Sequence, residues 1–123
     1  MARYIEELLI NNYLNLGKTI EVFLGRINID KTVLSYLEFT KTNSSKVQVT
    51  IIESYDEGNL NWLDIYDFSH FNQDDEFEII EFDSVDNAIE GVKAKFKLDE
   101  LKFVTQGMIQ VEYEDLLKSE GRN

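Results

Sequence analysis

The 123-residue chain carries 24 acidic and only 12 basic side chains, a formal net charge of −12, and it has no cysteine. The length fits a single domain over residues 1–123, and the lack of cysteine excludes disulfides, thiolate metal sites and thiol nucleophiles. The charge disfavours direct binding to nucleic acid or to an anionic membrane. No stretch approaches the roughly 18 apolar residues of a membrane-spanning helix, and the first residues lack the basic head and apolar core of a secretory signal. We therefore expect a soluble, cytoplasmic protein.

Residues 4–16 have the pattern of an amphipathic helix. Gly17 follows this stretch, and glycine tolerates the left-handed conformation with which many helices end. The pattern predicts an N-terminal helix that buries one apolar stripe. This stripe consists of Ile5, Leu8, Leu9, Tyr13 and Leu16.

After Gly17 the apolar residues alternate with polar ones, which is the pattern of half-buried strands. Four strands are predicted, at 18–25, 33–40, 47–55 and 60–68. The segments between them are a turn around 28–31, a polar loop at 41–46 and a turn at 56–59. Gly58 in the last turn can take positive φ. Connections of this length make neighbouring strands antiparallel.

A fifth strand is predicted at 76–83. Phe77 and Ile79 share one face by their parity, whereas Ile80 and Phe82 take the opposite face. One extra residue near Ile79–Ile80 would turn all four side chains to the same side, which is what a β-bulge does. We therefore predict a bulge in this strand.

The helix predicted at about 84–98 has the clearest pattern in the chain. Asp83 or Ser84 can cap its N-terminus, and lysines near its C-terminus complement the helix dipole. The stretch 101–113 can hold a short sixth strand, and 114–119 a terminal helical turn. The buried stripe of the helix is predicted to be Val85, Ala88, Ile89, Val92 and Phe96.

The order of these elements predicts an α+β fold. We expect an antiparallel meander sheet of four to six strands, with the N-terminal helix and the helix at about 84–98 packed on one face. The other face is expected to be partly solvated. Since the sequence contains no linker or repeat, one domain accounts for the whole chain.

The negative charge is concentrated in one segment. Residues 47–92 contain thirteen of the 24 acidic residues and none of the 12 basic ones. Random placement would put about four or five bases in a window of that length. Seven of the acids lie in 71–86, interspersed with phenylalanine and isoleucine. Repulsion confined to one region destabilises the fold unless something offsets it, and a cationic partner would do so.

The sequence contains no motif for catalysis, for a cofactor or for a dedicated metal site. The single histidine, His70, has no nucleophile or second histidine placed around it as a triad or a zinc site requires. The isolated glycines form no phosphate-binding loop. Acidic loops at 56–59 and 72–78 offer oxygen ligands without the spacing of a calcium-binding loop, so only a weak calcium site stays open. We therefore expect a non-enzymatic protein without a cofactor.

Aromatic residues accompany the acids and indicate where a partner would bind. In the predicted strand 60–68, Trp62, Asp64, Tyr66 and Phe68 share one face, which is a candidate for the exposed, functional face. Aromatic anchors within an acidic rim are typical of a hot spot for a basic protein. The same composition also fits an acidic surface that only keeps the protein in solution. The candidate partner-binding residues are Asp56, Glu57, Trp62, Asp64, Tyr66, Asp67, Asp74, Asp75, Glu76 and Glu78.

The chain resembles the small acidic immunity proteins of bacterial toxin–immunity systems, which neutralise basic nuclease toxins. The resemblance consists of the size, the lack of cysteine, the α+β pattern and the acidic segment 47–92. No signature motif is shared, so the resemblance assigns no residue a role. It implies a non-enzymatic inhibitor whose carboxylates take the place of nucleic-acid phosphates in the toxin.

Two other classes of protein stay open. A similar helix–meander outline occurs in cystatin-like domains, so a small-ligand-binding or enzyme-like domain with a pocket between helix and sheet is the first alternative. A structural or oligomerising subunit is the second. Because like charges disfavour self-association, we expect a monomer or a weak homodimer.

Overall fold

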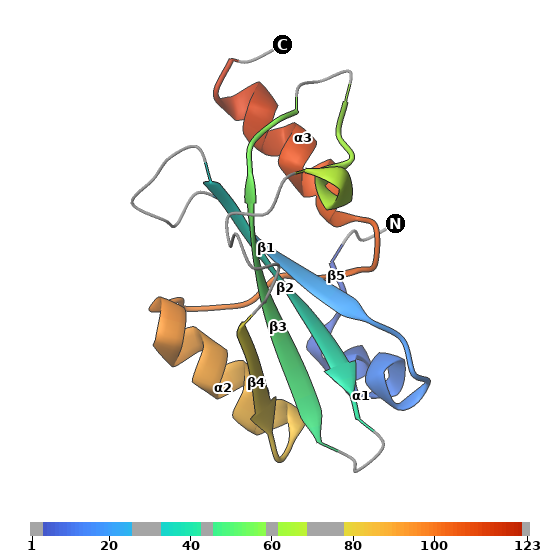
Figure 1. The fold of residues 1–123 in the computed structure, drawn as a ribbon. Helices are drawn as coiled ribbons and strands as arrows, with labels where there is room; N and C mark the ends of the chain where they lie inside the picture. Colours follow the sequence, from blue (N-terminus) through green and yellow to red (C-terminus); the bar gives the residue numbers. More distant parts are fainter. Residues whose placement is uncertain (1–3, 26–32, 43–45, 59–61, 69–77, 122–123) are drawn as a thin grey trace.

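A five-stranded antiparallel sheet forms the centre of the molecule (Figure 1). The computed structural model describes residues 4–25, 33–42, 46–58, 62–68 and 78–121. The strands are β1 (Ile20–Gly25), β2 (Val33–Lys41), β3 (Val47–Tyr55), β4 (Glu78–Phe82) and β5 (Phe103–Thr105), in the order β4-β3-β2-β1-β5. The helices are α1 (Glu7–Asn15), α2 (Val85–Phe96) and α3 (Ile109–Ser119), with a 3-10 helix, η1 (Ile65–Asp67). The predicted α+β class is confirmed.

Helices cover both faces of the sheet. α1 and α2 pack on one face, as predicted, and α3 and η1 pack on part of the other face (Figure 1). α3 is longer than the terminal turn predicted at 114–119. Ile109, Tyr113 and Leu117 recur at one-turn spacing and are fully buried, and their burial against the sheet stabilises the whole helix.

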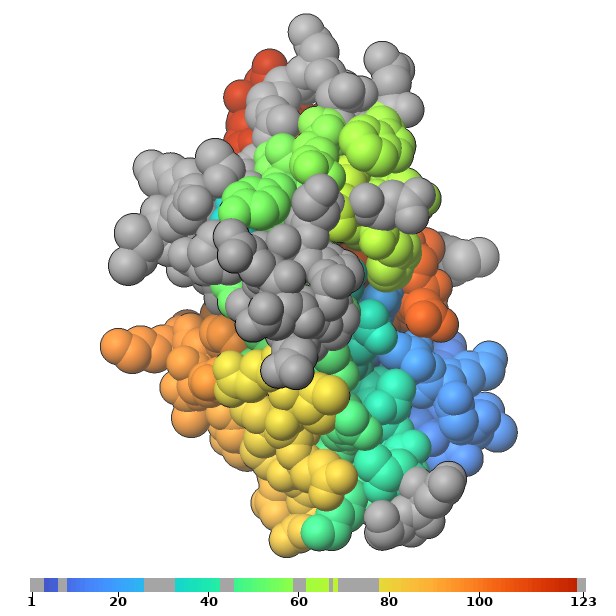
Figure 2. All heavy atoms as spheres, in the orientation of Figure 1, coloured from blue at the N-terminus to red at the C-terminus, as the bar shows by residue number. Residues whose placement is uncertain are grey.

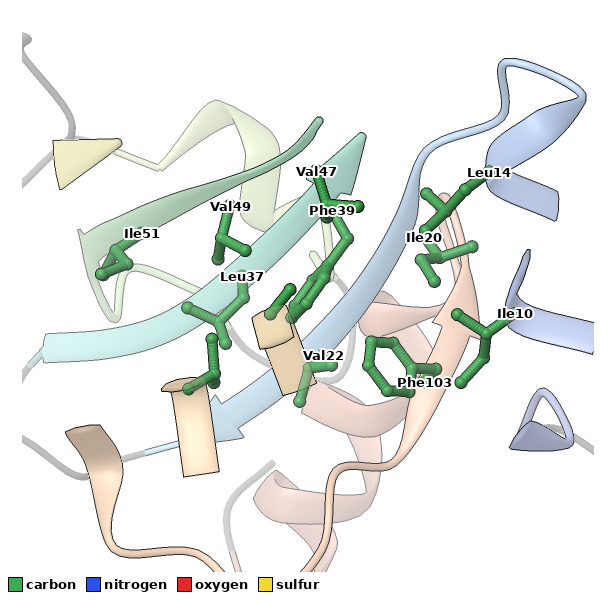
Figure 3. Packing of buried hydrophobic residues seen from close by; sticks show 12 residues of the cluster. Ile10, Leu14, Ile20, Val22, Leu37, Phe39, Val47, Val49, Ile51 and Phe103 are labelled. Carbon is green, nitrogen blue, oxygen red and sulfur yellow. The ribbon is translucent and has the colours of Figure 1, made fainter. Parts of the chain in front are cut away.

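The core on the α1 and α2 side is built from residues of all five strands together with both helices. The rings of Phe39 and Phe103 meet edge to face, with centroids 4.9 Å apart and planes at 79° (Figure 3). Ile10 and Leu14 of α1 point toward Ile20 of β1 (Figure 3). Full burial of each such side chain contributes roughly 1.5–3 kcal/mol to stability.

α2 has the capping and the buried stripe that the sequence predicts. The Ser84 hydroxyl accepts a hydrogen bond from the Asn87 N–H at 3.1 Å, which satisfies one of the unpaired donors of the first turn. Ala88 and Val92 are buried against β3 and β4. The helix ends at Lys97, whose φ of 57° lies in the left-handed region.

The buried stripe predicted for α1 is confirmed for Ile5 and Tyr13, which pack on the core, and is wrong for Leu9 and Leu16. The side chain of Leu8 lies outside the described residues. Leu9 is 41 % exposed and Leu16 is 73 % exposed, whereas Ile10 and Leu14 are the buried pair. Apolar residues cover a broad arc of this helix, so periodicity alone does not select the packed face. The face is set by contact with the sheet, and Gly17, with φ at 78°, ends the helix as predicted.

The bulge predicted in β4 is also wrong. The strand pairs with β3 in continuous register, from Val47 opposite Phe82 to Ile51 opposite Glu78. Ile80 and Phe82 pack on the α2 side, and Ile79 is 53 % exposed on the other face. The register of the sheet shifts instead in β1, between Phe23 and Gly25.

The segment predicted as a strand at 60–68 is not a strand in its described part. Residues 65–67 form η1, which packs on α3. Residues with high β propensity can therefore occupy a compact turn when the turn places their side chains in a core, as it does for Ile65 and Phe68. The turn predicted around 28–31 and the residue His70 lie outside the described residues.

Candidate partner-binding surface

Three aromatic rings connect the surface of the molecule to the core beneath α3. Trp62 meets Phe68 edge to face, with centroids 5.1 Å apart, and Phe68 meets Tyr113 of α3 in the same way at 5.6 Å. Phe68 and Tyr113 are buried, whereas Trp62 is 42 % exposed. Trp62 is therefore an exposed aromatic side chain that stands on a buried support.

Gly58 lets the chain pass close beneath this stack. A Cβ atom at position 58 would lie 2.5 Å from the Trp62 carbonyl oxygen and 2.8 Å from the Tyr113 hydroxyl, and it would also collide with the ring of Phe68. The glycine is needed for close approach and not for the positive φ that the sequence predicts, because its φ is not in the left-handed region.

α3 holds two acidic residues of the segments on either side of Trp62. The Tyr113 hydroxyl donates a hydrogen bond to the Asp56 carboxylate, and the Gln110 amide donates one to Asp64 at 3.3 Å. Glu57, next to Asp56, is exposed. Segments 55–58 and 62–68 lie next to each other at the upper end of the visible face (Figure 2). α3 thus fixes two of the predicted acids in place.

α3 also carries an ion-paired carboxylate that was not among the predicted binding residues. Glu114 lies one turn after Gln110 and forms an ion pair with Lys118 at 3.7 Å. The sequence does show a second stretch without bases, at 103–117. Only the fold brings this stretch to the segment 56–68, through the hydrogen bonds of Gln110 and Tyr113. We call the group Asp56, Glu57, Trp62 and Asp64 the acidic surface.

Tyr66 and Phe68 do not face outward as the predicted strand would place them. The Tyr66 hydroxyl donates to the carboxylate of Glu21 on β1, at 2.7 Å from Oε1 and 2.9 Å from Oε2. The Tyr66 ring meets Tyr36 edge to face at 6.0 Å. Tyr66 therefore holds η1 on the sheet instead of forming part of an exposed face.

Glu21 is a fully buried carboxylate that the sequence analysis did not single out. Its Oε1 accepts a hydrogen bond from the Gly107 N–H at 2.9 Å, and Glu38 lies opposite it on β2. Burial raises the pKa of Glu21, although the bonds from Tyr66 and Gly107 act in the other direction. Burial raises the pKa of Glu38 as well.

The remaining predicted binding residues lie elsewhere or outside the described residues. Asp67 belongs to η1. Glu78, at the start of β4, pairs with Lys95 of α2 at 3.2 Å. Asp74, Asp75 and Glu76 lie outside the described residues. The structure thus brings Asp56, Glu57, Trp62 and Asp64 together and directs Glu78 to a separate ion pair.

Lysines outside the acidic segment neutralise some of its acids. Besides the Glu78–Lys95 pair, Asp83 lies 3.9 Å from Lys46 and Glu90 lies 3.6 Å from Lys93. These pairs are exposed, and pairs of this kind contribute little to stability, about 0–1 kcal/mol. They reduce the negative field around β4 and α2.

The hollow between the helices and the sheet is small. Its volume is about 150 Å³, and its lining includes Ile10, Ile89, Phe103, Lys93 and Glu100. Pockets for small organic ligands usually measure about 300–1,000 Å³. A second hollow of about 400 Å³ is a shallow one between β1 and α3, lined by Glu112 and Asp115 among others.

Two further properties concern metals and membranes. Within the described ranges, no group of three or more His, Asp or Glu side chains is arranged to hold a metal ion. No helix formed by the described residues has the length and apolar character needed to span a membrane.

Comparisons with known proteins gave no match: no family model fits the chain, and no curated protein or solved structure is significantly similar to it.

Proposed function

We propose that this chain is a non-enzymatic binding module that uses its acidic surface to bind a positively charged protein. In its most concrete form, the proposal is an immunity protein that neutralises a basic nuclease toxin. The observation that carries it is Trp62, which is partly exposed, supported by Phe68 and Tyr113, and adjoined by Asp56 and Asp64.

The arrangement supports binding because of its rigidity and its charge. A large aromatic side chain that is already packed on one edge loses little conformational freedom when a partner covers it, which is a property of binding hot spots. The carboxylates around it attract lysine and arginine side chains and steer a basic partner during its approach.

Inhibition of a nuclease would follow from the same contacts. A nuclease binds nucleic-acid phosphates through basic side chains. Carboxylates held on a rigid surface can bind those side chains and exclude the substrate. Because such contacts are electrostatic, their strength falls as the salt concentration rises.

A pull-down from the source cell at low and at high salt tests the proposal. The immobilised chain should retain a basic protein at low salt and release it at high salt, and the purified chain should then inhibit the nuclease activity of that protein. Retention of no basic protein would contradict binding. Retention of a basic protein that has no nuclease activity would contradict only the immunity role.

Matched variants locate the contact. Glu57→Gln with Asp64→Asn removes two charges from the acidic surface. Asp99→Asn with Glu100→Gln removes two charges from the connection between α2 and β5, where Glu100 lines the hollow beside α1 and α2. The first pair should weaken retention and the second should not.

A further inference from the structure

Glu21 connects three separate parts of the fold. Its carboxylate lies on β1, and it is bonded to Tyr66 of η1 and to the Gly107 N–H in the turn between β5 and α3. The same Gly107 N–H lies 2.9 Å from the Tyr66 hydroxyl oxygen. These contacts hold η1 and the start of α3 on the sheet.

The groups that face Glu21 bring no positive charge to it. From β2 they are Tyr36 and Glu38, from η1 the group is Tyr66, and from the turn before α3 it is the Gly107 N–H. None of these groups in the described part of the chain is a base. An ionised carboxylate in this position is buried beside a second carboxylate without a cation to offset it.

We propose that Glu21 is a pH-sensitive latch, which holds η1 and the β5–α3 turn most firmly when its carboxyl is protonated and holds them less firmly once it is ionised. This device goes beyond the proposed function and does not depend on it.

The Glu21 carboxyl can form hydrogen bonds with Tyr66 and Gly107 in both its protonated and its ionised form. When protonated, Oε2 can donate to the Tyr66 hydroxyl oxygen, 2.9 Å away, while Oε1 still accepts from Gly107. When ionised, both oxygens accept hydrogen bonds, but the charge is buried and Glu38 repels it. Burial raises the pKa of Glu21 above the ordinary value of 4.5. Detachment exposes Glu21 to water and restores the ordinary pKa, so ionisation favours detachment.

Hydrogen exchange of the Gly107 amide tests this latch. The exchange rate, corrected for that of an unprotected amide, gives the equilibrium constant for local opening. In the wild type this constant should rise about tenfold for each pH unit between the ordinary and the raised pKa of Glu21, and should level off above it.

Glu21→Gln is the decisive variant. A glutamine amide has one donor and one acceptor end, as a protonated carboxyl does, so it should keep the latch closed without titrating. The opening constant of Gly107 should then lose the part of its pH dependence that comes from Glu21. An identical pH dependence in the variant and the wild type, or none in the wild type, would overturn the proposal.

Two more variants separate the latch from a merely structural contact. Tyr66→Phe removes a hydrogen bond that lowers the pKa of Glu21, so the rise in the opening constant should extend to higher pH. Glu38→Gln removes the repulsion from β2, so the rise should end at lower pH. Opposite shifts in these two variants support the proposal, and unchanged end points in both would contradict it.

Discussion

The hydroxyl of Tyr113, in the last helix, donates a hydrogen bond to the carboxylate of Asp56, which lies 57 residues earlier in the chain. Through this bond a helix outside the acidic segment fixes an acidic residue inside it. Tyr113 also supports Phe68, which in turn supports Trp62. The acidic surface therefore depends on α3 for its shape.

Removal of this hydrogen bond should lower stability. We expect Tyr113→Phe to reduce the free energy of unfolding by about 1–3 kcal/mol, because the Asp56 carboxylate loses the hydrogen bond that the Tyr113 hydroxyl donates to it. Urea unfolding would measure the change. Tyr13→Phe is the control, since the Tyr13 ring packs on the core near Lys18, and its effect should stay within about 0.5 kcal/mol. Equal effects of the two variants would contradict the role of the Tyr113 hydroxyl.

Substitution of Gly58 should destabilise the same region. In Gly58→Ala the new methyl group would collide with the Trp62 carbonyl and the Phe68 ring, and overpacking of this kind costs about 1–3 kcal/mol. Since Trp62 is the single tryptophan, its fluorescence should report the displacement directly. A Gly58→Ala protein with wild-type stability and wild-type tryptophan emission would contradict the need for glycine at position 58.

A buried tyrosine, Tyr36, and a half-buried one, Tyr66, should resist ionisation at alkaline pH. Burial raises the pKa of Tyr36 and of Tyr66 above the ordinary value of 10. Because the unfolded chain loses these protons first, stability should fall as the pH rises above 10. The ultraviolet absorbance of tyrosinate should show a late phase that accompanies unfolding. Tyr36→Phe with Tyr66→Phe should reduce the amplitude of that phase, and an unchanged amplitude would contradict the assignment.

Truncation of Trp62 should separate binding from folding. Trp62→Ala removes a side chain that is 42 % exposed, so stability should change less than in Tyr113→Phe. Affinity for the basic partner should fall about 30-fold or more, as expected for a hot-spot residue that contributes at least 2 kcal/mol. Titration calorimetry would measure this. Unchanged affinity would remove Trp62 from the proposed contact.

The strands that are joined by short connections could be predicted closely from the sequence. β1, β2 and β3 lie where the alternation of polar and apolar residues placed them, because each has one face packed under α1 and α2. The capped helix α2 was predicted equally well. In these elements the local pattern and the tertiary packing agree.

The surroundings of Glu21 and the conformation of the segment 62–68 could not be predicted, because the sequence does not show which faces of the strands other elements cover. Glu21 alternates with apolar residues as an outward-facing strand residue would, yet η1 and the turn before α3 bury it. Trp62 and Phe68 have strand propensity, but they belong to a compact segment shaped by Gly58 and Tyr113. For α3 a signal was present, since Ile109, Tyr113 and Leu117 have helical spacing.

The same limit applies to the candidate surface. Charge counting located the acidic segment, and the described structure attaches Asp56, Asp64 and, through Phe68, Trp62 to the same helix, α3. Charge counting could not show that Lys46, Lys93 and Lys95 form ion pairs with three of the acids in that segment. These pairs join residues on different elements or successive helical turns, so they depend on the fold.

The association rate constant for the captured basic protein, measured by stopped-flow fluorescence of Trp62 over a range of salt concentrations, tests the central claim most directly. We predict fast association at low salt that slows steeply as salt is added. Glu57→Gln with Asp64→Asn should slow association at low salt about three- to tenfold, while Asp99→Asn with Glu100→Gln should leave it within about twofold. An association rate that does not depend on salt, or an equal slowing by both pairs of substitutions, would contradict binding through the acidic surface.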